Sequence, residues 1–143
     1  MTLPTGVEID DECVRFSGRS GRLLLLSLLK RAKFAEPFAP EALLNPWIAS
    51  LVAQLTASVV PEAELQDFGD DPRIRHEIEQ LIASDAESSG WWRMTGAEKA
   101  DYLQAVVAAP FRMSDVVVEE IIFGVDNVLW NARKLVSIAD NLA

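Results

Sequence analysis

Few side chains in this sequence are able to perform catalysis. There is one histidine, His76, and one cysteine, Cys13, far apart in the chain. A zinc site of the usual Cys and His type needs more such ligands than these two. His76 stands between Arg75 and Glu77 on an expected helix, and the sequence displays no partner of the kind that a general base requires. We therefore expect no catalytic residue, no metal site and no cofactor.

Glycines and arginines surround the start of the first expected helix. Gly18 and Gly21 are spaced as in a phosphate-binding loop, but no Gly-Lys-Ser/Thr ending follows them. Arg15, Arg19 and Arg22 would favour an anion at a helix start. A solvated connector explains the same residues more simply.

Carboxylates recur along the last expected helix. At 100° per residue, Asp115, Glu119 and Asp126 fall within about 40° of one another on one stripe. A divalent metal would need a second helix with facing acids, as in Glu-x-x-His bundles, and no such motif occurs. We interpret the stripe as an exposed acidic face that binds a partner.

Two adjacent tryptophans, Trp91 and Trp92, follow a glycine in an expected loop. Both indoles cannot easily point inward, and tryptophan is a favoured anchor at protein interfaces. Arg93 would add a cation beside the rings. We predict all three as partner-binding residues, with one alternative: one indole closes the helix bundle and the other lies flat on it.

An acidic segment forms the second predicted binding surface. It surrounds an aromatic residue with carboxylates, which is what a partner with a basic groove would meet. An acidic loop that only serves solubility is the alternative. The predicted contact residues of this acidic segment are Glu62, Glu64, Asp67, Phe68, Asp70 and Asp71.

The overall charge favours a basic partner. The 143 residues have a net charge of −9, of which residues 1–33 contribute +2 and residues 34–143 contribute −11. Such a field repels phosphate backbones and anionic lipids. We therefore expect a protein partner, and neither nucleic acid nor a membrane.

A single cysteine allows no internal disulfide, so the cytoplasm is the expected location. Met1–Pro4 shows no sign of a secretion signal. The uncharged stretch 42–60 is interrupted by polar residues and proline, and we interpret it as a buried helix.

Capping residues, prolines and apolar periods predict five helices along the chain. Helices are predicted over 22–35, from Asn45-Pro46 to about 60, from Asp71-Pro72 to about 86, from Thr95 to about 108, and from Ser114 towards the end. The leucine-rich first helix is apolar on every side, which predicts central burial. Gly124 is expected to bend the last helix, which is long enough to pair with another chain.

The predicted fold is all-α: one domain over 1–143 with about five helices in a bundle. Alternating apolar residues at Val7–Ile9 and Val14–Phe16 predict a short hairpin, or an extended arm, within 1–19.

Three functions fit this sequence. The first is a non-enzymatic acidic protein that neutralises a basic effector, as a bacterial immunity protein or antitoxin does. The second is a structural or assembly protein, such as a phage or secretion-system chaperone or a subunit that self-associates through the last helix. The third is an enzyme that uses carboxylates and a metal.

Overall fold

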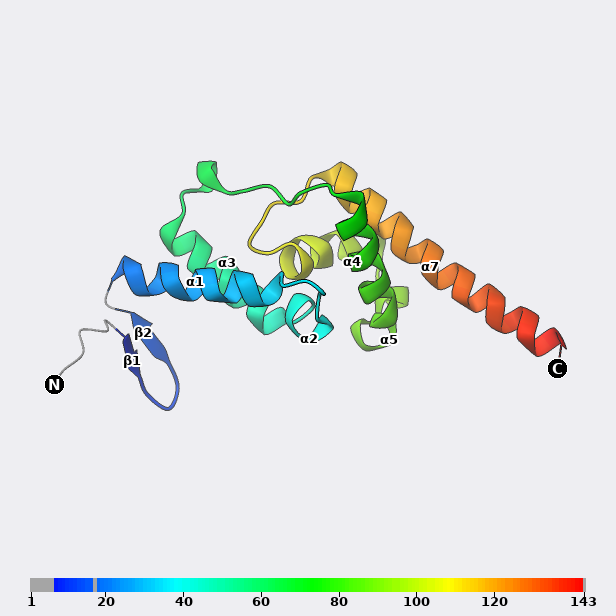
Figure 1. The fold of residues 1–143 in the computed structure, drawn as a ribbon, viewed down its shortest axis with the longest axis horizontal. Coiled ribbons are helices and arrows are strands. Elements are labelled where there is room, and N and C mark those ends of the chain that lie inside the picture. Colours follow the sequence, from blue (N-terminus) through cyan, green and yellow to red (C-terminus); the bar gives the residue numbers. More distant parts are fainter. Residues whose placement is uncertain (1–6, 17, 143) are drawn as a thin grey trace.

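The computed structural model describes residues 7–16 and 18–142, and it confirms the all-α fold with a short hairpin at its start (Figure 1). Our expectation for Met1–Pro4, and the part of the predicted 1–19 arm at residues 1–6 and 17, lie outside the described residues. In chain order the elements are β1 (Val7–Ile9), β2 (Val14–Phe16), α1 (Arg19–Lys33), α2 (Pro40–Leu43), α3 (Pro46–Val59), the 3-10 turn η1 (Glu62–Glu64), α4 (Pro72–Ser84), α5 (Ala86–Ser89), the 3-10 turn η2 (Trp91–Arg93), α6 (Gly96–Tyr102), the π-helical turn η3 (Leu103–Val107) and α7 (Asp115–Leu142).

The predicted starts of α3, α4 and α6 are confirmed by capping hydrogen bonds, whereas α1 begins at Arg19, three residues before its predicted start. The Asn45 side chain accepts from the backbone N–H groups of Trp47 and Ile48, and Asp71 accepts from that of Arg73. Thr95 and Glu98 form the expected capping box. These bonds satisfy N–H groups that have no partner within the helix, so each fixes where its helix begins.

The hairpin is closed by a carboxylate. β1 and β2 pair antiparallel, with Ile9 opposite Val14, and the Asp10 side chain accepts from the backbone of Glu12 and Cys13 in the turn between them. The Cys13 thiol also donates to this carboxylate, and the three hydrogen bonds together lower the pKa of the Asp10 carboxyl. A hairpin this short needs support, and β2 contacts α1.

The apolar core forms two clusters. The larger one joins α2, α4, η3 and the first half of α7, and Ile78, Ile82 and Ile121 are fully buried in it. The smaller one joins α1 and α3, with Leu26 and Val52 at its centre. The two long helices of this smaller cluster lie side by side at one end of the molecule, and α7 extends from the other (Figure 1).

Two features of the helices differ from the sequence prediction. The short helices α2 and α5 were not expected, because four residues show no apolar period. Helix α1 is not central: Leu23, Leu24 and Leu28 are exposed and only Leu26 among its leucines is buried. A protein of this size has too few helices to cover both sides of α1, so the second apolar side of α1 stays at the surface.

Gly124 does not interrupt α7, which is a continuous helix through that position (Figure 1). The residue instead permits a close approach of α4, because a Cβ at position 124 would clash with the carboxylate of Glu79. That carboxylate is buried, and burial raises its pKa against the opposing effect of Arg75. The expected bend is therefore wrong, and the glycine makes room for a side chain of the neighbouring helix.

Candidate binding surfaces

The paired tryptophans separate into one core residue and one surface residue. Trp91 is 0% exposed, its Nε1 donates to Asp126 Oδ1 at 2.8 Å, and its ring meets Tyr102 edge-on. Its prediction as a partner-binding residue is wrong, because its surface is already covered. Trp92 is half exposed, with the guanidinium of Arg133 over its ring, and Arg93 is exposed. The arrangement matches the alternative stated from sequence.

Most of the acidic segment is engaged within the protein. Asp67 pairs with Arg112 at 3.6 Å, Asp70 pairs with Arg75, and Asp71 caps α4. Phe68 was expected to be exposed, but it is half buried and packs near the rings of Phe34 and Phe111. These contacts fold the segment back onto the body.

Glu62 and Glu64 are the remaining residues of the acidic segment. Both are exposed in η1, and neither forms an ion pair with any other residue that the structure describes. They remain available to a basic partner.

The three carboxylates of the α7 stripe differ in their surroundings. Asp126 accepts from Trp91 and pairs with Lys99 at 3.2 Å, so it supports the core, although its side chain is still about 40% exposed. Asp115 and Glu119 are exposed. Within 7–16 and 18–142, no group of three or more His, Cys, Asp or Glu side chains is placed to hold a metal ion.

Two arginines at the start of α1 contact the C-terminal end of α3. Arg19 donates to the carbonyl of Val59 at 2.9 Å, and Arg22 lies 3.5 Å from that of Ser58. Both carbonyls belong to the last turn of α3, where cations complement the helix dipole. Two of the arginines considered for an anion site therefore act as caps.

A buried lysine joins α1 to the π-helical turn. Lys33 is fully buried, its Nζ donates to the carbonyl of Val107 at 2.6 Å, and it lies 4.5 Å from the centre of the Phe34 ring. Burial lowers its pKa to about 7. The amine is enclosed on all sides, so its contacts tie two elements together rather than face a ligand.

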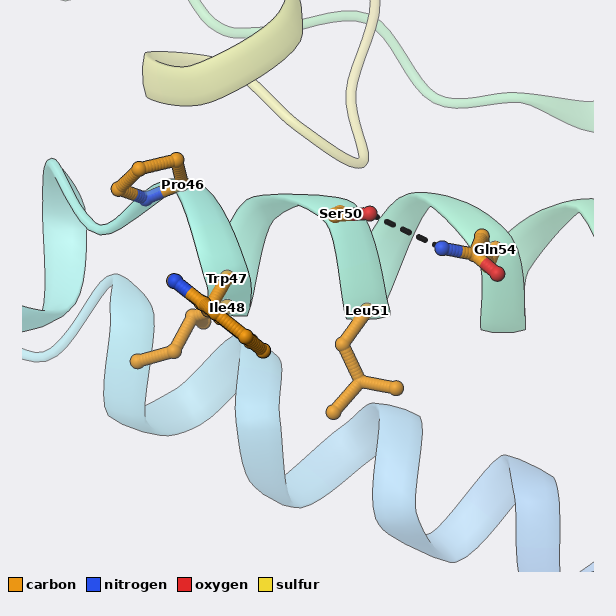
Figure 2. Close-up of a pocket in the computed structure, with 6 residues that line it drawn as sticks. All are labelled: Pro46, Trp47, Ile48, Ser50, Leu51 and Gln54. Carbon is orange, nitrogen blue, oxygen red and sulfur yellow. Dashed lines mark hydrogen bonds between the residues drawn. The ribbon is translucent and has the colours of Figure 1, made fainter. Parts of the chain in front are cut away.

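An apolar surface that the sequence pattern does not indicate lies on α1 and α3. We call it the α1–α3 face, and it consists of the exposed residues Leu24, Leu28, Trp47 and Leu51. Trp47 is 86% exposed. Figure 2 shows Trp47 and Leu51 on the side of α3 that faces α1, where they line a shallow depression of about 600 Å³. The missed signal was a tryptophan in the first turn of a helix that was expected to be buried.

A second apolar surface lies on the end of α7. From Trp130 onwards the side chains described on this helix are exposed, among them Leu135, Val136 and Ile138. Figure 1 shows this part of α7 extending beyond the other helices. A helix with large apolar residues on several sides normally lies within a core or an interface.

Comparison with known proteins gives no further guide: no protein-family model, curated protein or solved structure matches this chain. No helix in the described ranges is both long enough and apolar enough to cross a membrane.

Proposed function

We propose that this protein is a non-enzymatic binding domain that docks another protein onto its α1–α3 face. The observation that carries the proposal is the 86% exposure of Trp47, which lines the same depression as the exposed Leu51. An indole held in water gains much by burial, and clustered exposed apolar side chains mark interaction sites in proteins.

The charge beside this face indicates the chemistry of the partner. Arg31 lies on the exposed side of α1, one turn from Leu28. A partner helix whose apolar stripe is bordered by carboxylates would bury the leucines and pair with this guanidinium. We place the encounter in the cytoplasm, in line with the single cysteine.

Neutralisation of a basic effector is the second candidate function. It is supported by four exposed carboxylates, those of Glu62, Glu64, Asp115 and Glu119. In this case the acidic surface, and not the α1–α3 face, would meet the partner.

A capture experiment with matched tryptophan variants tests the first proposal. The full-length protein, Trp47→Ala and Trp130→Ala are immobilised and exposed to native lysate of the source organism, and captured protein is purified and titrated by calorimetry. Trp130 is a fair control because it is also largely exposed, at 63%, but lies on α7. We expect Trp47→Ala to lose at least about tenfold in affinity and Trp130→Ala to retain it.

The same titration distinguishes the second candidate. If Glu62→Lys with Glu64→Lys abolishes binding while Trp47→Ala leaves it intact, the partner is recognised by the acidic surface and our first proposal is wrong.

A further inference from the structure

One apolar seam runs along α7 from the core to its end. Positions 118, 121, 125, 128, 132, 135 and 139 follow one another at alternating steps of three and four residues, which is the heptad spacing of helices that pack side by side, and Val136 lies four residues after Ala132. The inner members Val118, Ile121 and Val125 are buried in the core. The outer members, which we call the distal seam, are Ala132, Leu135, Val136 and Ala139, and all are exposed.

The two parts of the seam lie on the same side of the helix. At 100° per residue, Ala139 repeats the direction of Ile121, and Ala132 lies about 20° from it. The distal seam therefore continues the face that α4 and its neighbours cover in the first half of α7. It lacks only the element that would cover it.

We propose that a second copy of this chain covers the distal seam, with its own α7 running antiparallel. Pairing over 129–142 spans roughly 20 Å along each helix. The two-fold axis then falls between positions 135 and 136. Leu135 of each copy meets Val136 of the other, and Ala132 meets Ala139, so large residues pack together and small residues allow the close approach between them.

The direction of pairing follows from the position of the core. Helix α4 packs on the seam side of α7, so a parallel partner would bring its own α4 into the space held by the first. In the antiparallel arrangement each body lies beyond the end of the other helix. Only this direction lets both distal seams be covered together.

Charge complementarity supports the same direction. The distal seam itself carries no ionisable residue, and Arg133 and Asp140 lie along one edge of it. In antiparallel helices equivalent edges face each other, so Arg133 of one copy approaches Asp140 of the other, twice by symmetry. A parallel pair would place both residues opposite a different edge. The pairing does not depend on the α1–α3 face or on any partner bound there.

Sedimentation of the full-length protein over a concentration series tests the dimer. We expect the wild type to pass from monomer to dimer with rising concentration, since two heptads give modest affinity. Leu135→Glu should raise the dimer dissociation constant at least about tenfold. Trp130→Glu is the matched control, because Trp130 is similarly exposed but points away from the seam, and it should dimerise as the wild type does.

Cysteine cross-linking tests the direction. In a Cys13→Ser background, Ala132→Cys mixed with Ala139→Cys should give a disulfide-linked heterodimer, whereas Ala139→Cys alone should give none. Cross-linking by Ala139→Cys alone would overturn the antiparallel arrangement. A wild type that stays monomeric up to about 1 mM would overturn the dimer altogether, and binding at the α1–α3 face would be unaffected by either result.

Discussion

The carboxylate of Glu79 on α4 lies directly against Gly124 of α7, in the space that a Cβ would fill. The same carboxylate lies 3.8 Å from Arg75, whose guanidinium also pairs with Glu120 of α7 at 2.6 Å. The glycine thus allows a charged side chain to lie between α4 and α7, two helices that pack against each other in the larger core.

The contact between Glu79 and Gly124 predicts that, in a double-mutant cycle, Gly124→Ala destabilises the wild type but stabilises a variant without the Glu79 carboxylate. In the wild type, Gly124→Ala displaces the Glu79 carboxylate and should lower the free energy of unfolding by about 1–3 kcal/mol. In a Glu79→Ala background the added methyl group at position 124 has room. The better helix propensity of alanine should then raise the free energy of unfolding by about 1 kcal/mol. Denaturant unfolding measures both.

Gly96→Ala serves as the control for that cycle, because a Cβ at position 96 meets nothing within 4 Å. It should behave alike in both backgrounds. Equal stabilisation by Gly124→Ala with and without Glu79 would show that the carboxylate does not occupy this space.

Lys33→Met should stabilise the protein, and the gain should depend on pH. The pKa of Lys33 falls from 10.5 to about 7 on burial, so the unfolded chain holds the proton more tightly than the folded one. The cost of burying the ammonium is present in full below pH 7 and disappears as the pH rises towards 10.5. We expect a gain on the order of a few kcal/mol at pH 6 that shrinks steadily by pH 10.

Urea unfolding of wild type and Lys33→Met across that pH range measures the difference, and carboxylates that titrate elsewhere cancel between the two proteins. Lys134→Met, at an exposed position of α7, should give no pH-dependent gain. A constant difference between Lys33→Met and wild type would contradict the lowered pKa.

Asp126 should matter for stability through the two groups that it holds. Asp126→Ala leaves the buried indole N–H of Trp91 without its acceptor and should cost about 1–3 kcal/mol. Asp126→Asn keeps an oxygen for the indole and loses the pairing with Lys99, so its cost should be smaller. Thermal unfolding ranks the two variants, with Glu119→Ala at an exposed position as the control; the reverse order would refute the hydrogen bond to Trp91.

The cap of α3 predicts a modest loss. Asn45→Ala removes the acceptor for two backbone N–H groups and should lower stability by about 1 kcal/mol. Asn45→Asp preserves the acceptor and should cost little. Chemical denaturation of the three proteins gives the comparison, and equal stability of all three would show that the cap contributes nothing.

The longer helices and the hairpin could be predicted from the sequence alone. Capping residues, prolines and apolar periods act within a few positions of the chain, so they fixed the starts of α3, α4 and α6 and the all-α class. The absence of paired histidines and cysteines is likewise a property of composition.

Which apolar and acidic side chains face water could be seen only in the tertiary structure. Trp91 and Trp92 are adjacent in sequence, yet one is enclosed by α6 and α7 and the other is not. The carboxylates of Asp67 and Asp126 pair with residues from distant segments, Arg112 and Lys99, whereas Leu24 and Leu28 of α1 stay exposed. Burial depends on what other elements arrive at a face, and that information is not local to the residues that form it.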